Sequence, residues 1–297
     1  MYSACDFRAL LFALAVTLAA PTARAAPPAP EPGHPTPVAA TDALRVCADP
    51  NNLPFSNRRG EGFENALAEL VARDLRRPLR YTWWPQRRGF VRNTLNAGRC
   101  DVVMGIPAQG YDLVLPTAPY YRSTYVFVTR HGAGPPIRSF DDARLRGLRI
   151  GIHTVGDDYN NPPPAEALAR RGLAANARGY SIYGDYTRDD PTRALIDAVA
   201  RGDVDTAVAW GPLAGFFARQ EAVALDVTPV VDDPGTRGLP MSFDIAMGVR
   251  RHDTALRGAL DGVLDRRKRE IARLLDRYGV PRVAAPTAHA RAEKELP

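Results

Sequence analysis

The chain has 297 residues, of which 45% are hydrophobic and 24% are charged, and its formal net charge at pH 7 is +6. A chain of this length and apolar content buries a sizeable core, which excludes a wholly disordered protein. The mild excess of positive charge is compatible with an anionic ligand or an acidic partner, but a solvated surface of mixed charge explains it equally well.

The N-terminal segment has the features of a secretion signal. Arg8 precedes an apolar run over residues 9–20, which is too short to span a bilayer and is followed by Pro21. Ala23-Arg24-Ala25 then supplies the small-x-small pattern after which signal peptidase cleaves. We therefore expect a signal peptide at residues 1–25, cleavage after about Ala25, and a periplasmic protein with no membrane anchor and no nucleic acid partner.

Two further segments lack the periodicity of folded elements. Residues 26–41 are rich in proline and alanine, a composition that favours an extended, solvated linker. Residues 282–297 are polar and aperiodic, and we expect a disordered tail there. The folded part is therefore predicted to lie between residues 42 and 281.

The first part of the folded region alternates short apolar strands with amphipathic helices. The predicted elements are a strand at residues 44–48, a helix at 63–75, a strand at 79–84, a helix from Phe90 that stops at Gly98, and a strand at 101–106. This order predicts an open, mostly parallel sheet with right-handed crossovers. We assign residues 42–130 to the first part of lobe I.

The pattern then restarts, which predicts a second lobe. A strand at 125–129 runs into the glycine-rich segment 131–135, which we interpret as the first crossing between the lobes. The elements that follow are strands at 148–152 and 205–210, helices at 164–171 and 192–201, a returning strand at 243–249 and a long amphipathic helix over 256–275. Residues 131–240 are thus lobe II and residues 241–281 complete lobe I. The prediction is an α/β fold of two open, mostly parallel sheets joined by a two-strand hinge.

The topology also predicts where a ligand would bind. In open α/β sheets, ligands lie outside the carboxyl ends of the strands. The loops after Ala48, Ile106 and Trp210 are therefore expected to face one cleft between the lobes.

Several motifs resemble the type II periplasmic solute-binding proteins: residues 44–55, Gly62-Phe63, residues 98–103 and residues 116–121. More narrowly, Cys47-Ala48-Asp49-Pro50-Asn51-Asn52 and the string Trp83-Trp84-Pro85-Gln86-Arg87-Arg88 resemble the branch associated with quinoprotein (methanol) dehydrogenases, the J proteins of the MxaJ/XoxJ type. The resemblance implies the two-lobed fold and a periplasmic quinoprotein dehydrogenase, or its cytochrome, as the partner.

The chain departs from the amino-acid-binding relatives at three places. Residues 109–112 contain no arginine to clamp a carboxylate, and Ala209-Trp210-Gly211 contains no acid to pair with an ammonium group. Residues 156–161 carry Asp157 and Asp158 where an anion-binding turn is expected. A free α-amino acid is therefore a poor ligand, and aromatic and apolar contacts are expected to dominate.

The candidate site residues follow from these loops and motifs. The predicted cleft consists of Asp49, Asn51, Asn52, Phe55, Trp84, Pro107, Tyr120, His153 and Trp210. The loop of asparagines and prolines can equally be a simple turn, and adjacent Trp83 and Trp84 point to opposite faces of a strand, so that one of them belongs to the core. Arg87 and Arg88 are candidates for docking an acidic partner, or they merely cap and solvate the next helix.

Cys47 and Cys100 lie on or beside strands that should share one sheet, so in an oxidising compartment we expect a disulfide between them; two buried thiols are the alternative.

No two histidines or cysteines have the spacing of metal ligands. Asp157 and Asp158 could bind a hard cation, but two carboxylates on a loop are more often exposed to solvent. We expect no metal and no cofactor.

Three functional classes compete: an accessory protein of a dehydrogenase system, the substrate-binding component of an importer for a small solute that is not an amino-acid zwitterion, and an enzyme on the same scaffold. An enzyme would need a charged acid or base and a clamp in the cleft, and the clamp is missing. A non-catalytic accessory protein is the favoured hypothesis, with the importer component as the alternative.

Overall fold

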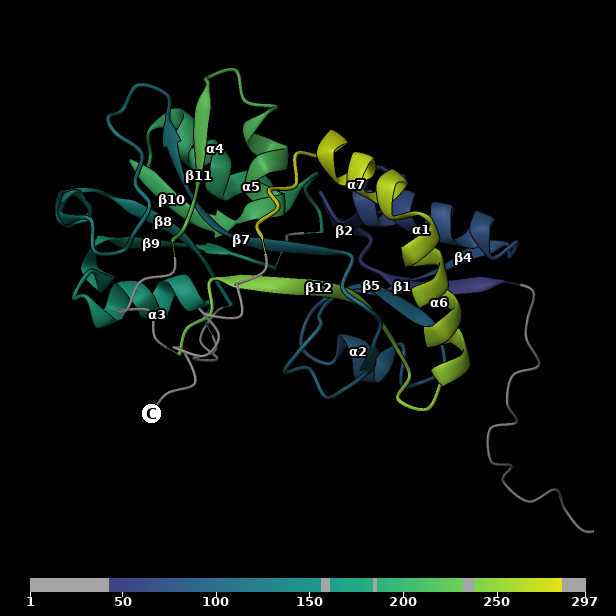
Figure 1. The fold of residues 1–297 in the computed structure, drawn as a ribbon. Helices are drawn as coiled ribbons and strands as arrows, with labels where there is room; N and C mark the ends of the chain where they lie inside the picture. Colours follow the sequence, from purple (N-terminus) through teal and green to yellow (C-terminus); the bar gives the residue numbers. More distant parts are fainter. Residues whose placement is uncertain (1–42, 156–160, 184–185, 232–237, 285–297) are drawn as a thin grey trace, which may run out of the picture. The chain divides into compact units, whose positions relative to one another are not determined.

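The computed structural model describes residues 43–155, 161–183, 186–231 and 238–284 (Figure 1). The chain divides into two compact units, residues 1–39 and residues 40–297, and every described residue lies in the second. The predicted signal peptide, the linker, both aspartates of the 156–161 segment and nearly all of the tail lie outside the described residues.

The first group of strands comes from the first part of the chain together with one strand near its end. It comprises β1 (Leu44–Ala48), β4 (Leu79–Trp83), β5 (Val102–Pro107), β6 (Leu115–Pro116) and β12 (Ser242–Val249). Strand β1 pairs in parallel with β4 and β5, and β12 runs antiparallel to β5 and β6. The helices that accompany these strands are α1 (Phe63–Asp74), α2 (Phe90–Asn93), α6 (Thr254–Arg266) and α7 (Lys268–Arg277).

A second group of strands is built from the middle of the chain. It comprises β7 (Tyr121–Arg130), β8 (Ile150–Thr154), β9 (Ala177–Ser181), β10 (Thr206–Trp210) and β11 (Leu225–Pro229). Strand β8 is parallel to β9 and β10, whereas β7 is antiparallel to β10 and β11. The helices here are α3 (Pro163–Arg170), α4 (Ala194–Arg201) and α5 (Gly211–Ala218).

Two long strands join the groups. Strand β7 pairs with β12 over Tyr121–Thr124 and then changes partner, pairing with β10 from Tyr125 to Thr129. Strand β12 pairs with β7 at its start and with β5 beyond it. The strand order β4-β1-β5-β12-β7-β10-β8-β9 confirms the predicted α/β class (Figure 1). The division into lobes at residue 130 stays a prediction, since the change of partner occurs inside β7.

Buried apolar side chains form separate clusters on the two groups. In the first, α1, α6 and α7 pack against β1 and β5 through residues such as Phe63, Leu67 and Leu274. In the second, α4 and α5 cover one face of the sheet through Leu195 and Phe217. Burying such a side chain stabilises the folded state by roughly 1.5–3 kcal/mol relative to leaving it exposed.

Several elements differ from the sequence prediction. The long C-terminal helix is two helices that meet at Arg267, where Arg266 and Arg267 both turn to the carboxylate of Asp74. Strand β7 begins at Tyr121, whereas the sequence predicted a strand that starts at Tyr125. Helix α5 was not predicted because Gly211–Ala218 is apolar on all sides and so has no amphipathic period.

The disulfide prediction is confirmed. Cys47 in β1 and Cys100 just before β5 are bonded, with their Cα atoms 5.5 Å apart. Both side chains are buried among Phe90, Val91 and Leu95. Among the described residues, no helix is long and apolar enough to cross a membrane.

Candidate functional site

A cavity of about 440 Å³ lies at the carboxyl ends of β1, β5 and β10. Each of the loops predicted to face the cleft contributes to it: Asn52 and Phe55 after β1, Pro107 at the end of β5, and Leu213 after Trp210. The described residues that line it are Asn52, Phe55, Glu64, Gln86, Gly105, Ile106, Pro107, Tyr121, Tyr125, His153, Val155, Ile182, Tyr183, Thr192, Trp210, Leu213, Phe243 and Ile245.

Five of the predicted cleft residues line this cavity: Asn52, Phe55, Pro107, His153 and Trp210. The other four are not among its lining residues. Tyr120 donates a hydrogen bond from its hydroxyl to the Met104 carbonyl (2.9 Å), and Trp84 packs under the Arg99 guanidinium, 5.1 Å from its ring centroid. Asp49 and Asn51 instead make contacts between loops.

Aromatic rings form one wall of the cavity. Tyr125 and Trp210 are directly opposite each other on β7 and β10, with ring centroids 5.4 Å apart. Phe243 on β12 lies 5.8 Å from Trp210, and both pairs are inclined at 67°. Burial raises the pKa of the Tyr121 hydroxyl in the same wall, and Trp210 opposes this shift.

Glu64 is the acidic side chain of the lining, and sequence reasoning missed it. It is the second residue of α1, whose start is packed so tightly that a Cβ on Gly62 would lie 2.0 Å from the Phe55 carbonyl oxygen. Burial and, to a lesser extent, the negative charge of Asp49 raise the pKa of Glu64 to about 8. Its carboxyl is therefore mostly protonated at neutral pH in the empty cavity.

His153 does not supply a positive charge to the site. It lies at the end of β8, is buried, and bonds to the main chain of Thr192. Burial lowers its pKa to about 4, so the imidazole is neutral at pH 7. No lysine or arginine is among the described lining residues, and within the described ranges no group of three or more His, Cys, Asp or Glu could hold a metal ion.

Beside the cavity, Asp49 and Asn51 connect the loop after β1 to Tyr186 and Arg188. The Asp49 carboxylate accepts hydrogen bonds from the Tyr186 hydroxyl (2.6 Å) and from the backbone N–H groups of Gln86 and Asn51 (2.6 and 2.8 Å). Asn51 in turn donates from its side chain to the Arg188 carbonyl (2.7 Å). Asp49 and Asn51 thus hold the two sides of the cleft together.

Arg87 takes part in the same contact. Its guanidinium lies 5.7 Å from the ring centroid of Tyr183 and 5.3 Å from that of Tyr186. Both Arg87 and Arg88 are exposed. Burial, followed by the hydrogen bond to Asp49, raises the pKa of Tyr186, so its hydroxyl stays protonated and remains the donor.

Replacing Tyr186 with Phe should loosen this contact, because it removes one hydrogen bond to a buried carboxylate and leaves the ring under Arg87. We expect the free energy of unfolding to fall by about 1–3 kcal/mol in urea titrations. Tyr183→Phe is the matched control and should change it by less than about 0.5 kcal/mol. Equal effects of both variants would show that the hydrogen bond to Asp49 has no special weight.

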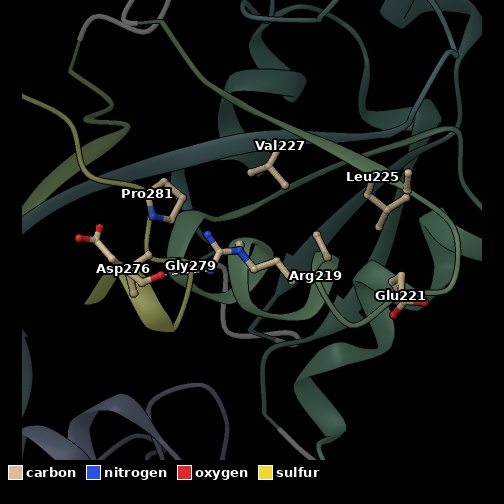
Figure 2. Close-up of a pocket in the computed structure, with 11 residues that line it drawn as sticks. Arg219, Glu221, Leu225, Val227, Asp276, Gly279 and Pro281 are labelled. Atoms are coloured by element: carbon tan, nitrogen blue, oxygen red, sulfur yellow. Dashed lines mark hydrogen bonds between the residues drawn. The ribbon is translucent and has the colours of Figure 1, made fainter. Parts of the chain in front are cut away.

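A second cavity, of about 630 Å³, lies between α5, β11 and the end of α7 (Figure 2). Arg219 extends across it and donates to the Asp276 carbonyl (3.1 Å), the contact drawn in Figure 2. Glu221 is already paired with Arg193 (3.1 Å). This cavity is larger, but its charged groups have partners and it lies away from the carboxyl ends of the strands, so we take the aromatic cavity as the candidate site.

Comparisons with known proteins agree with the fold described above. The family model of bacterial extracellular solute-binding proteins, family 3, matches residues 44–281. Protein MoxJ of Methylorubrum extorquens is 36% identical to this chain over 251 residues, which cover 80% of this chain and 81% of MoxJ. Protein MoxJ of Paracoccus denitrificans is 28% identical over 260 residues, which cover 82% of this chain and 90% of that protein. The crystal structure of the periplasmic binding protein XoxJ from Methylobacterium extorquens AM1 matches with a TM-score of 0.67 at 37% identity, covering 82% of this chain and 100% of XoxJ.

Proposed function

The chain belongs to the bacterial extracellular solute-binding proteins of family 3, and we propose that within this family it is a periplasmic accessory protein of a quinoprotein methanol dehydrogenase system. The predicted two-lobed type II fold and the resemblance to J proteins of the MxaJ/XoxJ type are confirmed. We propose that the aromatic cavity is the working surface, that it engages the dehydrogenase or its cytochrome, and that the protein acts after removal of residues 1–25.

The observation that supports this proposal most is the composition of the cavity wall. Tyr125, Trp210 and Phe243 provide a large apolar surface, and no guanidinium or ammonium group of the described lining residues could clamp the carboxylate of an amino acid. Aromatic side chains in desolvated pockets are the usual anchors of protein contacts. The cavity therefore suits an inserted side chain or short segment better than a zwitterion.

An importer component for a small solute is the second candidate. The volume of about 440 Å³ favours it, since small-molecule sites typically enclose about 300–1,000 Å³. The two candidates differ in their partner: an importer component responds to a free solute, whereas an accessory protein responds to a dehydrogenase-system protein.

A non-catalytic role agrees with the side chains around the cavity. The Thr192 hydroxyl donates to the Leu53 carbonyl (2.8 Å), and the neutral His153 is bonded to main chain, so neither forms a nucleophile and base pair. Arg87 and Arg88 remain proposed docking residues at the mouth of the cleft, where Arg87 already contacts two tyrosine rings.

We predict that Trp210→Ala weakens the complex with the dehydrogenase or cytochrome at least tenfold, because a desolvated aromatic anchor commonly contributes about 2 kcal/mol or more. The measurement is the Kd from surface plasmon resonance with the folded variant. Trp83→Ala is the matched control: Trp83 stacks on Tyr81 (4.5 Å) and is not among the lining residues, so the Kd should stay within twofold.

If Trp210→Ala and the control bind alike, the cavity is not the contact surface. If neither the dehydrogenase nor the cytochrome binds, while an uncharged small solute raises the melting temperature in a dose-dependent way, the importer candidate replaces the accessory role.

A further inference from the structure

We propose that the cavity recognises an alkylammonium head, carried by a free amine or by a lysine side chain of a partner, through the carboxylate of Glu64 and the aromatic rings beside it. This inference rests on the proposed function, since it gives the chemistry of the group that occupies the same cleft. It narrows the occupant from any apolar group to one with a single positive charge.

Glu64 is an acid without a counter-ion. Within the described part of the chain its carboxyl has no hydrogen-bond or ion-pair partner, and the described lining offers no lysine or arginine. His153 is neutral at pH 7 because burial lowers its pKa to about 4. An ionised Glu64 therefore leaves one uncompensated negative charge at the cavity, which is costly until a cation neutralises it.

Local packing places this carboxyl at the cavity. A Cβ on Gly105, a lining residue of β5, would lie 2.2 Å from Oε1 of Glu64, so the carboxyl occupies the space that a side chain at residue 105 would fill. The position of Glu64 in the first turn of α1 also favours its ionised form. The Glu64 carboxyl is therefore positioned to contact a ligand in the cavity.

The rings complete a cage for a cation. The Trp210 ring is inclined at 67° to the Tyr125 ring and at 67° to the Phe243 ring, so it stacks on neither, and all three residues line the cavity. Burial and, to a lesser extent, the charge of Glu64 raise the pKa of the Tyr121 hydroxyl, and Glu64 and Tyr121 both line the cavity beside these rings. Aromatic faces beside a carboxylate are the usual recognition elements for alkylammonium ions.

Binding of a cation should release a proton. Among the described residues, the groups that interact electrostatically with Glu64 are the Asp49 carboxylate and the hydroxyls of Tyr81, Tyr120 and Tyr121, and none of them is a cation. The pKa of Glu64 is about 8 in the empty cavity, and a bound ammonium ion lowers it. At pH 7 the acid therefore gives its proton to the solvent as the cation binds, and the affinity rises with pH up to about 8.

Calorimetric titration of the mature protein tests the proposal. The probes are choline chloride, n-butylammonium chloride, Nα-acetyl-lysine N-methylamide, and 3,3-dimethylbutan-1-ol, which has the shape of choline without its charge. We expect at least one cation to bind tenfold or more tighter than the neutral alcohol. Titration at pH 7 in two buffers of different ionisation enthalpy should show proton release.

Two variants isolate the acid. Glu64→Gln keeps the shape and should weaken cation binding at least tenfold, abolish proton release and leave binding of the alcohol unchanged. Glu69→Gln removes an exposed acid from the same helix and should leave cation binding and proton release unchanged. Binding of the blocked lysine would assign the cage to a partner side chain, and binding of choline or butylammonium alone would assign it to a free amine.

The proposal is overturned if no cation binds, if the alcohol binds as tightly as the tightest-binding cation, or if Glu64→Gln leaves cation affinity unchanged. These outcomes are separable from failure of the proposed function. Loss of cation recognition with intact, Trp210-dependent binding of the dehydrogenase or cytochrome contradicts only the alkylammonium inference, whereas cation binding without any such partner contradicts only the accessory role.

Discussion

Removing the disulfide by the double substitution Cys47→Ala, Cys100→Ala should lower the free energy of unfolding by about 4 kcal/mol. The bond joins residues with a sequence separation of 53, so it restricts a long loop in the unfolded chain. It also lies in the buried cluster with Phe90 and Leu95, next to the strand that leads into the Asp49 loop. The measurement is urea unfolding of the mature protein under oxidising conditions.

Reduction of the wild-type protein is the internal control. Dithiothreitol should lower the wild-type stability towards that of the double variant and should leave the double variant unaffected. A double variant that unfolds at the wild-type urea concentration, with an unchanged slope, would show that the bond contributes little to folding.

Glu64→Gln should remove a pH-dependent loss of stability. Glu64 has an ordinary pKa of 4.5 in the unfolded chain and about 8 in the folded protein. Below pH 4.5 both states are protonated; between pH 4.5 and 8 the unfolded state ionises first, so folding becomes less favourable as the pH rises. The variant should therefore be more stable than the wild type above pH 8, by on the order of 4 kcal/mol, with the difference disappearing near pH 4.5.

The difference between variant and wild type is the quantity to measure, by urea unfolding at several pH values without added ligand. Subtraction cancels the titration of all other groups. Glu69→Gln, exposed on the same helix, should give a difference below about 0.5 kcal/mol at every pH. A Glu64→Gln difference that does not vary with pH would contradict the raised pKa of Glu64.

Strand and helix patterns predicted most of the fold because the apolar residues repeat with clear periods. The β1 prediction at Leu44–Ala48 agrees with the structure, and Cys47 and Cys100 could be paired because two parallel strands bring them together. The start of β7 was missed since the aromatic segment before Tyr125 has no polar and apolar alternation. The edge strand β9, Ala177–Ser181, is mostly polar and gives no such pattern either.

The site was predictable only where topology determines it. Phe55, Pro107 and Trp210 follow strand ends, and each lines the cavity. Glu64 was missed because an acid in the first turn of a helix usually faces solvent, and its burial depends on the close approach of Gly105 from a distant strand. Asp49 was expected in the cleft, but its contacts with Tyr186 and Gln86 depend on loops whose positions the sequence pattern does not define.

The most direct test of the central claim is hydrogen–deuterium exchange of the mature protein with and without the dehydrogenase or cytochrome of its own periplasm. If the aromatic cavity is the working surface, the partner should slow amide exchange in residues 51–57 and in α5 immediately after Trp210. No change on adding either partner, or slowed exchange confined to segments far from the cavity such as α6, would contradict the claim.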